Sequence, residues 1–68
     1  MLTGKQQQVL EFIREYIDDN RYPPTVREIG IALGIKSTST VQACLNALED
    51  AGAISRVRES SRSIRVIY

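Results

Sequence analysis

Apolar residues recur at intervals of three and four from the N-terminus to about residue 51, and this spacing predicts three amphipathic helices. Thr3 and Gln6 have the spacing of a capping box, which places the start of the first helix at Thr3. We expect the inner face of this helix to consist of Val9, Leu10, Ile13, Tyr16 and Ile17, with Phe12 at its edge. Three acidic residues fall on the opposite, solvent-facing side, namely Glu11, Glu15 and Asp18.

The second helix is short and has a start and a stop signal. Pro23 and Pro24 end the first helix, because proline lacks a backbone N–H and pushes the residue before it toward extended geometry. Thr25 and Glu28 then form a second capping box, and Gly34 supplies a residue that can adopt positive φ at the helix end. The residues expected to face inward are Val26, Ile29, Ala32 and Leu33. A helix of about two turns must be stabilised by packing on its neighbours.

The third helix is predicted at about residues 38–51. Ser37 is the best N-cap before it, and Gly52 ends it. Its buried stripe is expected to consist of Val41, Cys44, Leu45 and Leu48, with Ala51 at the margin.

Two segments rich in β-branched residues, 53–58 and 62–67, predict two strands with a loop at 59–61. Ile54, Ile64 and Val66 are expected to face inward, whereas Arg65 and Arg62 face outward. Two strands alone are only marginally stable, so they must lean on the helices. The predicted fold is therefore mainly α with a small β-hairpin: a winged helix-turn-helix of three helices and a two-stranded antiparallel wing, forming one domain over residues 1–68.

Size and composition exclude several classes of function. A chain of 68 residues, 43% hydrophobic and 25% charged, can form one modest core but has little material to enclose a substrate cavity. No apolar run approaches the roughly 20 residues of a membrane span. The chain has no histidine and only one cysteine, Cys44, which argues against a zinc site and an internal disulfide. We expect Cys44 to be a packed apolar residue, and we expect no catalytic residue, metal or cofactor.

Charge is unevenly distributed along the chain, although the formal net charge is only +1. Acidic residues outnumber basic ones in residues 1–20, whereas arginines predominate in residues 53–68. A positive face can therefore exist on a chain that is close to neutral as a whole.

The outward face of the third helix carries the candidate chemistry. Ser39, Gln42, Ala43 and Asn46 lie opposite the buried stripe, and no charge interrupts this face before Glu49. The second and third predicted helices form the helix-turn-helix. In this motif the second member, here the third helix of the chain, enters the major groove, where Gln and Asn pair with adenine through its N6 and N7. This face has no arginine, the commonest reader of guanine, which points to positions containing A·T pairs.

Several groups around this face are suited to the DNA backbone. The start of the third helix favours anions, and Lys36 lies beside it. The hydroxyls of Thr38 and Thr40 can contact phosphates, and their methyls can contact thymine. Each feature also has a plainer interpretation: residues 37–40 as a polar N-cap region, Gln42 and Asn46 as solvated surface, and the arginines of the wing as protection of a strand edge.

Five motifs resemble the DNA-binding domain of LexA repressors. They are Gln6-Gln7-x-Val9-Leu10-x-Phe12-Ile13, Tyr22-Pro23-Pro24-Thr25-Val26-Arg27-Glu28-Ile29-Gly30, Ser39-Thr40-Val41, Leu45-x-x-Leu48-x-x-x-Gly52-x-Ile54 and Ser61-Arg62-Ser63-Ile64-Arg65. The similarity covers nearly the whole chain. It implies a winged helix-turn-helix that binds palindromic operators as a dimer and represses genes of the SOS response to DNA damage.

The resemblance also assigns residues by position. Ser37, Ser39, Thr40, Gln42 and Ala43 fall where that family contacts bases, whereas Lys5, Lys36 and Arg62 fall where it contacts phosphate or groove. Adding the residues chosen from the helix face, we predict base reading by one set of side chains: Ser39, Thr40, Gln42, Ala43 and Asn46. We predict backbone contacts by a second set: Lys5, Arg27, Lys36, Ser37, Thr38 and Arg62.

Two departures from the family pattern are visible in the sequence. LexA repressors carry a second domain in which a serine–lysine dyad cleaves the linker, and we expect this chain to lack that domain. Asp50 and Ala51 precede Gly52 where many members have basic residues, which argues against phosphate contact from that end of the helix.

The function predicted is sequence-specific binding of double-stranded DNA by a LexA-like repressor, without enzyme activity. We expect a monomer in solution that pairs with a second copy on a palindromic operator, located in the cytoplasm of a bacterium or encoded by a phage. The alternative is a winged-helix module that docks on another protein. The near-neutral charge, Asp50 and the outward-facing Ile31 beside Arg27 favour it, whereas the uncharged reading face favours DNA.

Overall fold

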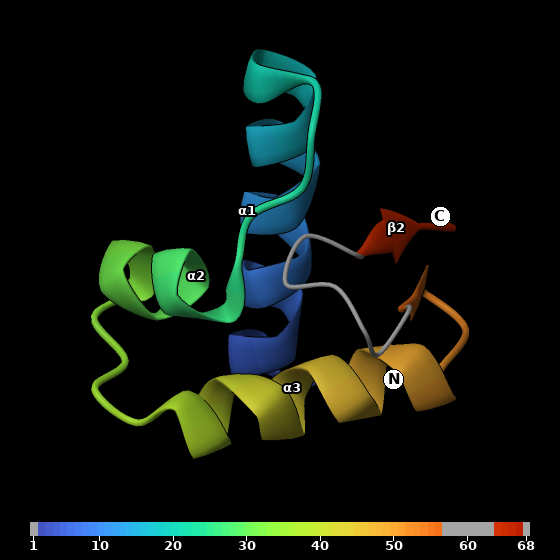
Figure 1. The fold of residues 1–68 in the computed structure, drawn as a ribbon. Helices are drawn as coiled ribbons and strands as arrows, with labels where there is room; N and C mark the ends of the chain where they lie inside the picture. Colours follow the sequence, from blue (N-terminus) through green and yellow to red (C-terminus); the bar gives the residue numbers. More distant parts are fainter. Residues whose placement is uncertain (1, 57–63, 68) are drawn as a thin grey trace.

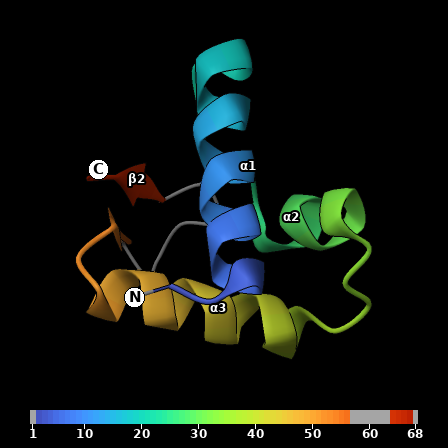
Figure 2. The ribbon, with the colours of Figure 1, turned by 180° about the vertical axis from the view of Figure 1, so that it is seen from behind.

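The computed structural model describes residues 2–56 and 64–67. Three helices come first, α1 (Gly4–Asn20), α2 (Val26–Leu33) and α3 (Thr38–Asp50), and the strands β1 (Ile54–Ser55) and β2 (Arg65–Val66) follow. The first half of α1 packs against α3, and α2 and the strands lie on opposite sides of α1 (Figure 1, and from behind in Figure 2). This architecture is the predicted winged helix-turn-helix.

Both predicted capping boxes are present. The Thr3 hydroxyl accepts the Gln6 amide at 3.2 Å while the Gln6 side chain accepts the Thr3 amide at 3.1 Å. At the start of α2 the corresponding distances between Thr25 and Glu28 are 3.1 and 2.8 Å. Because these bonds satisfy orphan amides reciprocally, each helix start is fixed by residues within one turn of it.

The first helix ends without glycine. Arg21 adopts a left-handed conformation at φ 68°, and its amide donates to the Ile17 carbonyl at 2.8 Å. Beyond it the ring of Tyr22 lies 5.8 Å from that of Tyr16, which in turn lies 5.7 Å from Phe12. The edge-on contact between Tyr16 and Tyr22 joins the proline-containing segment to the C-terminal half of α1.

The core lies where α1, α2, α3 and the strands meet. Its buried members are Val9, Leu10, Ile13, Ile29, Val41, Cys44, Leu45, Leu48, Ala53, Ile54 and Ile64. The predicted stripe of α3 and the centre of the α1 stripe are therefore confirmed, and Cys44 is packed as expected. Tyr16 and Ile17, predicted to face inward, are only half-buried, because the C-terminal half of α1 extends beyond α3.

One inward prediction in α2 was wrong. Ala32 is exposed, whereas Gly30 is buried beside Ile29. The buried face of α2 follows the spacing 26, 29, 30 and 33, and residue 32 lies about 110° away from its centre at 100° per residue. The small residue of α2 that faces the core is thus Gly30, which lies close to the turn that follows α2.

The two strands pair antiparallel, with Ile54 opposite Val66 and Ser55 opposite Arg65. Within the described residues both strands are shorter than predicted. Residues 57–63, which include Arg62 and the expected loop, lie outside the part of the chain that the structure describes. Ile54 and Ile64 are buried, Val66 is partly buried and Arg65 is exposed, as predicted. The Ile67 amide donates to the Ala53 carbonyl at 2.8 Å and the Ala53 amide to the Leu48 carbonyl at 2.9 Å, which ties the strands to the end of α3.

No helix among the described residues is both long and apolar enough to span a lipid bilayer.

Replacing Leu45 by alanine tests the role of α3 as the centre of the core. Leu45 is 0% exposed on the helix that contacts α1, α2 and β1. Leu45→Ala should lower the free energy of unfolding by about 2–5 kcal/mol, because it removes buried methyl groups and leaves a cavity. Urea unfolding measures this loss. The exposed control Gln8→Ala should change stability by no more than about 0.5 kcal/mol, and equal effects of the two would contradict the assignment.

Candidate nucleic-acid interface

The turn between α2 and α3 is closed by backbone hydrogen bonds to the last turn of α2. Gly34 adopts φ 70°, as predicted from its position, and its amide points to the carbonyls of Gly30 and Ile31. The Ile35 amide also donates to the Gly30 carbonyl, at 2.8 Å. The turn is therefore folded back against α2, and Ile35 packs against the core.

Gly30 permits this close approach. A Cβ at Gly30 would lie 3.0 Å from the Ile35 carbonyl oxygen and 3.5 Å from Val41 Cγ2. The first contact is with backbone and is tighter than side chains normally make, so the glycine sets how near α2 lies to the turn. Because Val41 belongs to α3, the same residue sets the separation of α2 from α3.

The start of α3 differs from those of α1 and α2. Ser37 is its N-cap residue, as predicted, but its side chain makes no capping hydrogen bond. Only the Ser37 carbonyl takes part, accepting the amides of Thr40 and Val41 at 3.2 and 3.4 Å. The first amides of α3 therefore have no capping side chain, and the positive end of the helix dipole faces solvent.

The face chosen from the sequence is exposed in full. Ser39, Gln42, Ala43 and Asn46 are all exposed, and so is Thr40. The side of α3 turned away from α1 has no other described element over it in Figures 1 and 2. α3 therefore presents a row of small and uncharged polar side chains to the surroundings.

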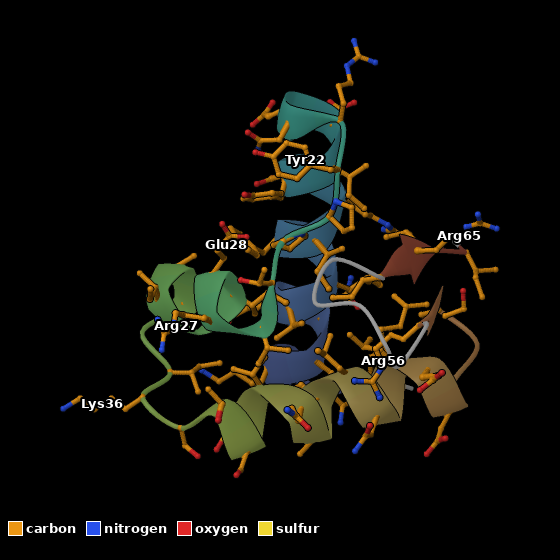
Figure 3. All side chains as sticks on the ribbon, in the orientation of Figure 1. Tyr22, Arg27, Glu28, Lys36, Arg56 and Arg65 are labelled. Atoms are coloured by element: carbon orange, nitrogen blue, oxygen red, sulfur yellow. The ribbon has the colours of Figure 1, made fainter. Side chains whose placement is uncertain are left out.

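Three of the predicted backbone-contacting residues lie around one hollow. This open hollow, of about 390 Å³, lies between α2, the turn and the start of α3 and is lined by Arg27, Gly30, Ile31, Ile35, Lys36 and Thr38. Arg27 comes from α2, Lys36 from the turn and Thr38 from the first turn of α3. Lys36 extends into solvent and Arg27 lies above the turn (Figure 3). The hollow is thus bordered by two basic residues, a hydroxyl and a helix N-terminus, with the end of Lys36 turned to solvent.

The other predicted backbone contacts are distributed differently. Lys5 is exposed in the first turn of α1, at the end that packs on α3. Ser37 is exposed at the start of α3, beside the hollow. Arg62 lies outside the described residues.

Sequence reasoning missed a contact that crosses from the strands to α3. We expected the arginines after residue 53 to protect a strand edge or to reach DNA, but Arg56 turns back onto α3 (Figure 3). Its guanidinium donates to Glu49 Oε1 from Nε at 3.3 Å and from Nη2 at 3.0 Å, and Nη2 also donates to Asn46 Oδ1. No local sequence pattern predicts this contact, because the two partners lie on the far side of the Gly52 turn from Arg56.

The comparison with known families decides the class of this helix-turn-helix. The family model described as the LexA DNA binding domain matches residues 1–63. The chain belongs to the LexA DNA-binding domain family. The resemblance inferred from the five motifs is therefore confirmed, and α2 and α3 form the helix-turn-helix of a LexA-type domain.

Curated LexA repressors align with nearly the whole chain. The LexA repressor of Sorangium cellulosum is 50% identical over 64 residues, which are 94% of this chain and 28% of that protein. The LexA repressor of Caldicellulosiruptor saccharolyticus is 48% identical over 66 residues, 97% of this chain and 33% of that protein. That of Bacillus mycoides is 44% identical over 66 residues. The chain thus spans about a third of the length of the repressors that it matches.

Replacing Gly30 by valine tests the close approach within the LexA-type helix-turn-helix. The added side chain must displace the Ile35 carbonyl or separate α2 from α3. Gly30→Val should therefore destabilise the domain by about 1–3 kcal/mol, as overpacking does. The matched control is Gly4→Val, because a Cβ at Gly4 meets nothing within 4 Å. Thermal unfolding compares the two variants, and an equal fall in melting temperature would show that crowding at Gly30 is not the cause.

Proposed function

We propose that this chain is the sequence-specific, double-stranded DNA-binding part of a LexA-like transcriptional repressor, with α3 placed in the major groove. The observation that carries the proposal is the exposed, uncharged face of α3, flanked at its start by basic groups and an N-terminus without a capping side chain. A helix face without charge is unusual on a solvated surface, whereas amide, hydroxyl and methyl groups match the edges of bases.

In this proposal the exposed face of α3 reads bases. Gln42 offers an amide that can both donate and accept, the combination that adenine presents in the major groove. The small side chains of Ser39 and Ala43 let α3 approach the bases closely, and the methyls of Thr40 and Ala43 suit thymine. All five proposed reading residues lie in the first three turns of α3, the part of a recognition helix nearest the base edges: Ser39, Thr40, Gln42, Ala43 and Asn46.

Backbone contacts in the proposal centre on the hollow beside the start of α3. A phosphate there would meet the guanidinium of Arg27, the ammonium of Lys36 and the Thr38 hydroxyl, together with the first amides of α3. Ser37 lies beside them, and Lys5 would supply a second contact from the start of α1. Arg62 would supply a third from the wing. Such contacts fix the position of a helix on the duplex without carrying sequence information.

The proposal extends to a pair of copies on one operator. A single α3 reads one half-site, and specific affinity usually needs two half-sites about a helical turn apart. We therefore propose that the chain is monomeric in solution, that two copies bind a palindromic operator, and that the genes controlled belong to the SOS response. Binding to the bacterial chromosome would place the protein in the cytoplasm, and no catalytic step is required of this chain.

A second candidate function is docking on another protein through the outer side of α2. The observation that favours it is Ile31, which is 75% exposed at the rim of the hollow. Single exposed apolar residues are common, however, and Arg27 and Lys36 beside it give this surface a positive charge better matched to phosphate.

Gln42→Ala tests base reading. Duplexes selected by the wild-type chain from a random pool should contain two inverted half-sites. Against them Gln42→Ala should bind about five- to a hundredfold more weakly, because one amide pair with a base contributes about 1–3 kcal/mol of discrimination. Gel shifts with selected and scrambled duplexes measure both affinities. The exposed glutamine of α1 gives the control Gln8→Ala, which should bind as the wild type does, and a wild type that selects no sequence would overturn the proposal.

Lys36→Ala tests the backbone contact. Removing one phosphate-binding charge should weaken binding to selected and scrambled duplexes by a similar factor, and it should make the negative slope of log K against log salt shallower by about 0.9. The control is Arg21→Asn, which removes a charge at the end of α1 remote from α3 and keeps a side chain that tolerates positive φ. An unchanged salt slope in Lys36→Ala, or an equal change in the control, would remove Lys36 from the interface.

A further inference from the structure

Arg56 makes a contact on the proposed reading face itself. Its Nη2 donates to Oδ1 of Asn46, a residue one turn beyond Gln42 and Ala43 on the exposed side of α3. Asn46 is thus the base-reading candidate whose polar atom already has a protein partner in the described structure. The contact links the strand region to the reading helix.

The guanidinium of Arg56 is fixed in this position. Glu49 Oε1 accepts from both its Nε and Nη2, at 3.3 and 3.0 Å, and the Arg56 side chain is only 18% exposed. Arg56 donates two charge-assisted bonds to a single carboxylate oxygen, which orient the planar group, and its partly buried position limits competition from water for these bonds. Arg56 therefore reaches Asn46 from a defined direction.

The chemistry of the two groups determines which way the amide of Asn46 turns. Arginine has donors and no acceptor, so only Oδ1 of Asn46 can face it. The Nδ2 amino group is then the part of the amide left for other partners. A free asparagine can turn either its oxygen or its amino group to a partner, whereas Asn46 held by Arg56 has Oδ1 directed at a guanidinium that takes one of its two lone pairs, and its amino group is turned to other partners.

We propose that Arg56 is a positioning residue that sets the base preference of Asn46, changing it from adenine to guanine. Adenine needs an acceptor for its N6 amino group as well as a donor for N7, and Oδ1 of Asn46 is turned toward Arg56, whose positive charge disfavours a second donor there. Guanine presents two acceptors, N7 and O6, which match a group that only donates. The inference rests on the proposed major-groove function and concerns one base pair in each half-site.

The test compares base preferences of matched variants. Wild type, Asn46→Ala and Arg56→Met each select duplexes from a random pool, and the position that loses its preference in Asn46→Ala identifies the base facing residue 46. There the wild type should favour guanine over adenine by at least about fivefold. Arg56→Met keeps the length of the side chain but frees Oδ1, so adenine should become the favoured base at that position, with the preferences elsewhere unchanged.

Two further variants separate positioning from a structural effect. Glu49→Gln removes the ion pair but leaves a carbonyl oxygen to accept from Arg56, and it should retain the guanine preference. Asn46→Asp keeps an oxygen for Arg56 and offers the second oxygen as an acceptor, so the preference should move to cytosine, whose N4 amino group donates. Unfolding curves of all variants confirm that the compared chains are folded.

The outcomes distinguish this inference from the proposed function. A wild type that binds no duplex selectively overturns both. Selective binding with an adenine preference in the wild type, or with a guanine preference that survives Arg56→Met, overturns the role of Arg56 alone. If Asn46→Ala changes the preference at no position, or if Arg56→Met abolishes a guanine preference at a position that Asn46→Ala leaves unchanged, Asn46 is not the reader that Arg56 orients, and the inference is likewise overturned.

Discussion

The close packing of α2 against the turn and α3 at Gly30 is the constraint on which the rest of the structure depends. A two-turn helix has little stability of its own, so its place is determined by what it contacts. With no side chain between them, the Gly30 carbonyl can accept the Ile35 amide, and the turn folds back on α2. The start of α3, with Lys36 and Thr38 beside it, is positioned as a result. Geometry at one residue of the core thus determines where the charged groups of the proposed interface lie.

Much of the fold could be predicted because its determinants are local. Each capping box joins residues three apart, such as Thr25 and Glu28, and the positive φ at Gly34 follows from the end of a short helix. The exposed face of α3 was predicted from helical period alone. Ala32 was predicted to lie in the core, whereas the buried small residue of α2 is Gly30. Residue type alone does not distinguish two such small residues. The spacing of the larger apolar residues of α2 does, because it places residue 30 and not residue 32 on the buried face.

The missed part of the candidate site has a different cause. The contact of Arg56 with Asn46 and Glu49 depends on how the chain returns after the Gly52 turn, and no spacing along the sequence encodes that path. From the sequence, Arg56 is one of several similar arginines. Only the fold separates it from Arg65, which is exposed on β2. The formal net charge of +1 is equally uninformative, because the acidic face of α1 and the basic surroundings of α3 offset each other in the sum.

The exposure of the α3 face has a consequence for how such domains diverge. Ser39, Gln42 and Ala43 contribute nothing to the buried core, so the scaffold tolerates substitutions there and each can change independently of the others. Asn46 is different, because it shares a partner with Glu49. If Asn46 reads a base as proposed, a new preference at that position requires coordinated changes at more than one site, and drift there should be slower than along the rest of the face. In the proposed function, the domain therefore combines reading positions that the core leaves free to change with one, Asn46, that is coupled to its neighbours through Arg56.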